Sequence, residues 1–114
     1  MISYWIDDRR DPKYSLEKEE MDNITWLKEI VPALDIVEEN AENIEFLYLD
    51  YFMDHDYVYG NEFLFLIMCL GKEKFKNLKT IFLHSSDKGI VEDMIFKYKE
   101  TFDDMEINLE EAKY

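Results

Sequence analysis

The stretch that decides the fold is residues 44–49, Ile-Glu-Phe-Leu-Tyr-Leu, which ends at Asp50. A short apolar and aromatic run without Gly or Pro is typical of a buried β-strand. Upstream, Pro32 suits the first turn of a helix, and apolar residues recur at helical spacing from there to a stop at Asn43. Downstream, a second helix is predicted over residues 60–70. The central strand is therefore expected to lie between two helices.

The rest of the chain continues this alternation. Further strand-like runs occupy residues 2–6, 24–31 and 80–83, with a weaker one at 105–109. A third helix is predicted from a cap at Ser86 or Asp87 to Phe102. Residues 9–23 are polar and are predicted to be a long loop with at most one helical turn, at residues 16–21. Alternating strands and helices indicate a single α/β domain over the whole chain, with a parallel sheet.

Composition and charge argue against several classes of protein. The 114 residues, 47% of them hydrophobic, suffice for one folded, soluble domain. The formal net charge of −14 repels nucleic-acid backbones, which are bound through Lys and Arg. No apolar run approaches the roughly 20 residues of a membrane span, and no secretory signal precedes the first strand. Cys69 is the only cysteine and is expected to be a buried small hydrophobe in a cytoplasmic protein.

Acidic residues at the predicted strand ends form the best candidate site. Asp7 and Asp8 follow the first strand, and Asp50 follows the third. Ligands of open α/β sheets bind beyond the carboxyl ends of the strands, so the three carboxylates converge if these strands are neighbours. Hard divalent cations take such oxygen ligands. We therefore predict that Asp7, Asp8 and Asp50 bind Mg²⁺ or Mn²⁺, although an Asp after a strand often serves only the turn.

Other polar residues near the same edge suit a phosphate group. Arg9 and Arg10 could hold a phosphate through their guanidinium groups, and Ser85 could donate a hydrogen bond to a phosphoryl oxygen. His84 could act as an acid or a base because its unperturbed pKa lies near neutrality. His84, Ser85 and Asp50 are therefore the candidate catalytic residues.

A second acidic group follows in the next loop. Asp54, His55 and Asp56 look like a run of metal ligands, but adjacent side chains rarely all reach one ion. We prefer Asp50 as the site acid because it directly follows an uninterrupted apolar run. Asp54 and Asp56 are then secondary candidates.

An ordered set of motifs extends over most of the chain: residues 6–12 (Ile-Asp-Asp-Arg-Arg-Asp-Pro), Trp26, Leu49-Asp50, Gly60 and His84-Ser85. Their order and spacing resemble the receiver domains of two-component response regulators, and more closely the divergent cyclic-phosphate-processing receiver domains. The resemblance implies a receiver-like (flavodoxin-like) parallel sheet of about five strands with helices on both faces. The first helix of a receiver is missing or reduced in this chain, because the loop predicted at residues 9–23 takes its place. It also implies a phosphate-ester ligand, such as a cyclic phosphate or a nucleotide.

Some positions depart from the family pattern. Arg9 stands where an acid is usual, and the Asp-His-Asp letters occur at residues 54–56. Receivers also carry a Lys after the fifth strand, and Lys113 is placed too late in the chain to be an obvious counterpart. The missing fifth-strand Lys argues against a third possibility, a phosphoacceptor switch at Asp50.

Two classes of function remain open. The first is metal-dependent binding or processing of a small phosphate ester, with the domain acting as a phosphoesterase. The second is a non-enzymatic acidic module, an inhibitor or nucleic-acid mimic, that binds a basic protein partner, as the net charge of −14 suggests. Neither involves a membrane or a nucleic-acid groove. The abundance of Lys, Glu and Asn is compatible with an AT-rich coding sequence, such as that of a phage.

Overall fold

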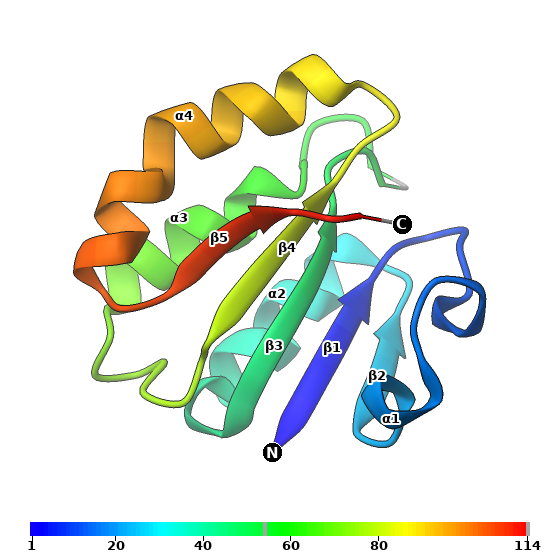
Figure 1. Ribbon diagram of the computed structural model, residues 1–114, viewed down its shortest axis with the longest axis horizontal. Coiled ribbons are helices and arrows are strands. Elements are labelled where there is room, and N and C mark those ends of the chain that lie inside the picture. Colours follow the sequence, from blue (N-terminus) through cyan, green and yellow to red (C-terminus); the bar gives the residue numbers. More distant parts are fainter. Residues whose placement is uncertain (54, 114) are drawn as a thin grey trace.

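A computed structural model describes residues 1–53 and 55–113 of the chain. Within these residues, five parallel strands form one sheet in the order β2-β1-β3-β4-β5 (Figure 1). The strands are β1 (Ile2–Ile6), β2 (Ile24–Leu27), β3 (Ile44–Asp50), β4 (Thr80–His84) and β5 (Asn108–Glu111). This arrangement confirms the predicted flavodoxin-like α/β fold, with β3 at the centre of the sheet.

The helices are unequally distributed over the two faces of the sheet. They are α1 (Lys18–Met21), α2 (Ile30–Glu39), α3 (Asn61–Leu70) and α4 (Lys88–Asp104), with short 3₁₀ turns at Pro12–Tyr14 and Ala41–Asn43. The connection from β1 to β2 runs toward one edge of the sheet, whereas the connections from β2 to β3, β4 and β5 run toward the opposite edge. Because parallel crossovers are right-handed, α2, α3 and α4 fall on one face and α1 on the other. Figure 1 shows α1 in front of the sheet and α2 and α3 behind it.

The core lies between the sheet and α2, α3 and α4. Tyr4, Leu47, Ile81 and Leu109 are register partners across β1, β3, β4 and β5, so they point to the same face. All four are buried. The helices contribute apolar residues to the same cluster, chiefly Ala33, Val37, Phe63, Leu64, Ile67, Val91, Met94 and Phe102. The core is therefore one-sided, as expected when the first helix is reduced.

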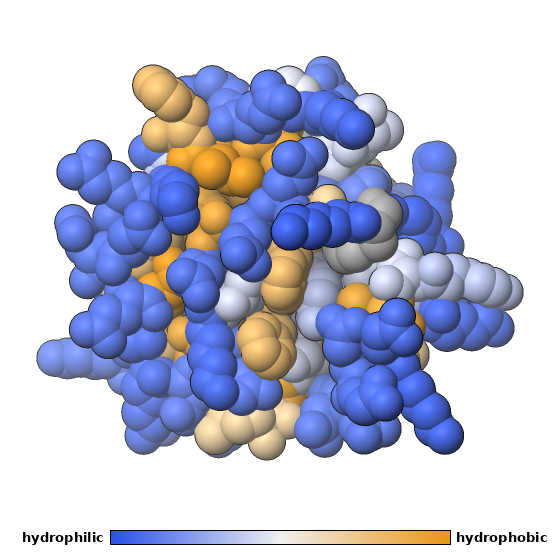
Figure 2. All heavy atoms as spheres, in the orientation of Figure 1, coloured by the Kyte–Doolittle hydropathy of each residue, from blue (hydrophilic) through white to orange (hydrophobic). Residues whose placement is uncertain are grey.

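The opposite face has little cover, and we call it the open face. Its central residues are Phe46, Tyr48 and Phe82 on β3 and β4, with Glu110 beside them on β5. Of the helices described, only the four-residue α1 lies over this side. Figure 2 shows this face, where a pale apolar strip over the middle of the sheet is surrounded by hydrophilic side chains.

The boundary between β2 and α2 differs from the prediction. β2 ends at Leu27, and α2 begins at Ile30 rather than at Pro32. Pro32 is tolerated in the first turn because the amides there have no partner within the helix. α2 ends at Glu39, and the remaining residues to Asn43 form the second 3₁₀ turn. β-branched residues at 30 and 31 favoured a strand, but the packing of Ile30 in the core favours the helix.

Two further expectations were wrong. The last strand is Asn108–Glu111 and not 105–109, because residues 105–107 form the turn that ends α4, with Glu106 at a positive φ of 59°. Cys69 is exposed and not buried. It lies on α3, which packs through Phe63, Leu64 and Ile67 and leaves its outer side uncovered. Although nearly every residue of α3 is apolar, only one side of the helix is buried.

No helix in the described part of the chain has the length and apolar character that crossing a membrane requires.

The one-sided core predicts different effects for two phenylalanines on α4. Phe102 is fully buried, whereas Phe96 is 90% exposed. We expect Phe102→Ala to lower the free energy of unfolding by about 3–5 kcal/mol, since it leaves a cavity in the core. The same change at Phe96 is expected to alter it by less than about 0.5 kcal/mol. Urea unfolding of both variants checks this, and similar losses would mean that α4 does not pack as described.

Candidate functional site

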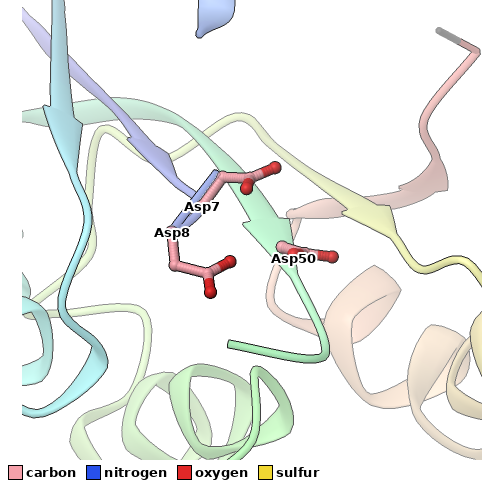
Figure 3. Close-up of side chains that lie close together, drawn as sticks. All are labelled: Asp7, Asp8 and Asp50. Atoms are coloured by element: carbon pink, nitrogen blue, oxygen red, sulfur yellow. The ribbon is translucent and has the colours of Figure 1, made fainter. Parts of the chain in front are cut away.

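Three aspartates converge at the carboxyl edge of the sheet. β1 and β3 are neighbours, so Asp7 and Asp8 at the end of β1 lie beside Asp50 at the end of β3 (Figure 3). Each can offer one oxygen, and the three oxygens lie within 4.8 Å of one another. Oxygens bound to one Mg²⁺ or similar ion lie within about 4–5 Å of each other. The donor set and its spacing therefore fit a hard divalent cation.

Asp7 shapes the loop that follows β1. The carboxylate is buried, and its Oδ1 accepts hydrogen bonds from the backbone amides of Arg9 (2.9 Å) and Arg10 (3.0 Å). Its Oδ2 accepts a bond of 2.8 Å from Arg10 Nε. Asp7 thus has the turn role considered as the simpler alternative. Because a carboxylate oxygen has more than one lone pair, this role still leaves room for a cation.

The two tryptophans hold the same loop from its backbone side. Trp26 Nε1 donates to the carbonyl oxygen of Asp7, and Trp5 Nε1 donates to that of Arg10, each at 2.7 Å. These bonds fix both ends of the segment that presents the aspartates. The only sequence signal for this role was a Trp on each of two strands. Tryptophans that only pack in the core would give the same signal.

Arg9 and Arg10 have different positions. Arg10 turns inward, where it pairs with Asp7 and places Nη1 3.0 Å from His84 Nε2. The side chain of Arg9 is 87% exposed and lies 3.7 Å from Asp8. Arg9 is therefore the arginine on the rim of the site, and Arg10 is part of its internal structure.

The contact with Arg10 indicates the tautomer of His84. A guanidinium group only donates, so Nε2 must accept, and the proton of the neutral ring is then on Nδ1. Nδ1 lies 3.5 Å from Asp50 Oδ1. Burial and the neighbouring Arg10 both lower the pKa of His84. His84 is therefore a neutral link between Arg10 and Asp50 near pH 7.

Asp50 is incompletely compensated in this arrangement. Burial, together with the negative charge of Asp7, raises its pKa from 3.8 to about 7, and Arg10 offsets only part of this. A bound cation favours the ionised carboxylate. The site thus has the electrostatic property expected of acids that share a metal ion.

His84 lines two cavities. One, of about 260 Å³, is lined by the three aspartates, Arg9, Arg10, Phe52, Met53, His84 and Ser86. The other, of about 360 Å³, is lined by His84, Ser85, Lys88 and Lys113, with Glu111 and apolar residues. The first is acidic and the second contains two lysines. With His84 common to both, they offer places for a cation and for an anionic group.

The second cavity contains two lysines, Lys88 and Lys113, to which the sequence analysis assigned no role. Lys113 follows β5, whose continuation is bonded to β4 through Ala112 N and Leu83 O at 2.8 Å. It therefore lies near the fifth-strand position that the sequence left without an obvious Lys. Lys88, in the first turn of α4, carried no sequence signal. Ser85 Oγ accepts a bond of 3.1 Å from the amide of Asp87, and Ser86, rather than Ser85, lines the acidic cavity.

The loop after β3 does not extend the acidic cluster within the described residues. His55 Nδ1 accepts bonds from the amides of Tyr57 (3.0 Å) and Val58 (3.1 Å), so it stabilises a turn. Asp56 is exposed and does not belong to the cluster of potential ligands. Asp54 lies outside the described residues. Of the two third-strand candidates that the structure describes, Asp50 and Asp56, Asp50 is the one placed beside Asp7 and Asp8.

Gly60 is required by space at the back of the site. Its amide donates to Tyr51 O at 2.9 Å, and a Cβ at this position would lie 2.3 Å from the carbonyl oxygen of Asp50. Its φ of −57° is ordinary for any residue. The close approach of α3 to the end of β3 therefore explains the glycine in the motif.

No model of a protein family matches this chain, and no curated protein matches it either.

The raised pKa of Asp50 predicts a pH-dependent stability in the presence of EDTA. Between about pH 4 and 7 the folded protein binds more protons at Asp50 than the unfolded chain does, so stability falls as the pH rises through this range. Asp50→Asn removes this effect. At pH 8 the free energy of unfolding of the variant should exceed that of the wild type by about 1–3 kcal/mol. The difference should fall toward zero near pH 4. Urea unfolding across this range, with Asp35→Asn as control, tests it; a constant difference would contradict the assignment.

A methyl group at residue 60 should disturb the site through the backbone of Asp50. We expect Gly60→Ala to lower the free energy of unfolding by about 2–4 kcal/mol, because backbone atoms must move apart. Gly89→Ala is the control, since its Cβ would approach only the flexible Asp87 side chain, at 3.2 Å. That change should cost less than about 1 kcal/mol. Denaturant unfolding compares them, and equal effects would argue against a spatial requirement at Gly60.

Proposed function

We propose that the domain binds a divalent cation, Mg²⁺ or Mn²⁺, through Asp7, Asp8 and Asp50 and uses it to bind and process a phosphate ester. The observation that carries the proposal is that His84 lines both an acidic cavity and a cavity that contains two lysines. A phosphate ester bound to a cation needs positive groups for its remaining oxygens. The resemblance to receiver-like domains that process cyclic phosphates points to the same ligand class.

The cation would neutralise the aspartates and polarise a phosphoryl oxygen. Each aspartate has a distinct part in holding it. Asp7 is fixed by the loop amides and by Arg10, Asp8 faces the cavity from the same loop, and Asp50 comes from the central strand. The ligands therefore come from both a strand end and a rigid turn, which keeps them in place without a cation.

Other residues of the chain would bind the phosphate and move a proton. Lys88 and Lys113 supply positive charge, and Ser85 supplies a hydroxyl in the second cavity. Arg9 can close over the acidic cavity from its rim. His84 carries its proton on Nδ1, and it would give this proton to the leaving oxygen of the ester as the P–O bond breaks. Asp50 would stay ionised as a ligand of the cation, and Arg10 positions His84.

Thermal unfolding with and without Mn²⁺ or Mg²⁺ tests the metal site. A cation at about 100 times its Kd adds roughly 2.7 kcal/mol to the free energy of unfolding. For a domain of this size this corresponds to a rise in Tm of about 10 °C. Asp8→Asn with Asp50→Asn should abolish the rise. Asp35→Asn with Asp104→Asn changes the net charge equally on exposed helical positions and should retain it. A rise that persists in the site variant would refute the proposed ligands.

The ester part is tested on the same proteins with bis-(p-nitrophenyl) phosphate and a 2′,3′-cyclic nucleotide. We expect cleavage that depends on the cation and is lost in the site variant, and weaker binding in Lys113→Ala. Binding of the cation without binding or cleavage of either ester would restrict the function to metal binding.

A further inference from the structure

The open face carries a row of aromatic rings. Trp5 and Tyr48 have ring centroids 5.6 Å apart, Tyr48 and Phe82 stack at 4.9 Å with an interplanar angle of 13°, and Phe46 lies 6.3 Å from Phe82. Trp5 and Tyr48 are buried, whereas Phe46 and Phe82 remain partly exposed. Apolar rings at the middle of a sheet are normally covered by a helix or by a second sheet. Here the helices of the described chain cover them only at one side.

A groove crosses this face between α1 and β5. It consists of two cavities, of about 300 Å³ and 200 Å³, that share Glu20, Tyr48 and Phe82. Its floor is aromatic, and its walls are acidic. The charged residues that line it are Glu19, Glu20, Glu45, Glu110, Glu111 and Lys113.

The two walls of the groove have carboxylates in defined places. Glu20, on α1, lies 3.5 Å from the Tyr48 hydroxyl. Burial, together with the charge of Glu20, raises the pKa of Tyr48 to about 12, so the hydroxyl keeps its proton and donates. Glu110 faces Glu20 from β5, and Glu45 is already paired with Lys79 at 2.9 Å. Glu20 and Glu110 are therefore the principal acids on opposite sides of the floor.

The charge of the groove restricts what can cover it. A second copy would bring the same glutamates against these glutamates in a chain of net charge −14, and a nucleic acid would be repelled. A complementary surface needs apolar side chains at its centre and positive charge on both flanks. An amphipathic helix rich in Lys and Arg has this pattern, with a diameter of about 10 Å.

We propose that the open face binds a basic amphipathic helix of a partner protein. Apolar side chains of the helix cover Phe46 and Phe82, and its Lys and Arg residues pair with Glu20 and Glu110. Guanidinium groups also pack favourably on aromatic rings, which the floor provides. This surface shares Glu111 and Lys113 with the lysine-containing cavity, but it includes none of the three aspartates. The residues that carry the proposal, Glu20, Glu110 and Phe82, have no part in the proposed function, so the proposal does not depend on it.

The test measures, by calorimetry at low salt, the affinity of the domain for an 18-residue synthetic helix of Leu and Lys. Glu20→Gln with Glu110→Gln should weaken binding by about tenfold or more. Glu38→Gln with Glu39→Gln, on the exposed side of α2, has the same net charge and should change affinity by less than about twofold. Equal losses in the two double variants would overturn the proposal, because binding would then reflect net charge alone.

The aromatic floor is tested separately. Phe82→Ser should weaken binding of the peptide by about tenfold. Phe96→Ser, which changes an exposed position on α4, should leave the affinity unchanged. Circular dichroism shows whether each variant is folded. If Phe82→Ser does not fold, the glutamate variants alone test the proposed surface.

Asp8→Asn should leave peptide binding unchanged, which separates this surface from the metal site. Self-association of the chain that is lost in Phe82→Ser would also overturn the proposal, since a second copy would then be the occupant.

Discussion

The buried carboxylate of Asp7 is the interaction on which the carboxyl edge of the sheet depends. It binds two backbone amides of its own loop and the Nε of Arg10, and Arg10 in turn contacts His84. One side chain thereby sets the path of the loop after β1 and the orientation of a histidine on β4. Removing it would leave Arg10 partly buried without its closest carboxylate, a costly state in a protein interior.

The same constraint explains why Asp50 has unusual properties. Parallel pairing places the end of β3 against the end of β1, so Asp50 cannot avoid the charge of Asp7. Burial and the neighbouring charge of Asp7 together give Asp50 its high pKa, and a cation is one way to relieve it.

The reduced first helix has a second consequence, on the open face of the sheet. With only α1 between β1 and β2, the face opposite the core keeps its aromatic residues partly exposed. In a chain of net charge −14 these rings are surrounded by carboxylates, which oppose self-association. The two candidate surfaces therefore differ in chemistry: hard oxygen ligands at the edge of the sheet, and an apolar strip with an acidic rim on its face.

The sequence by itself determined the order of strands and helices, since hydrophobic periodicity is local, and it identified Asp7, Asp8 and Asp50 because strand ends in a parallel sheet meet at one edge. Only the tertiary structure decided which neighbours each residue has. Cys69 is exposed although its helix is apolar, Lys113 lines the same cavity as His84, and Arg10 rather than Arg9 turns inward. Such facts depend on how elements pack and on which side of a loop a side chain leaves. Neither is encoded in spacing along the chain.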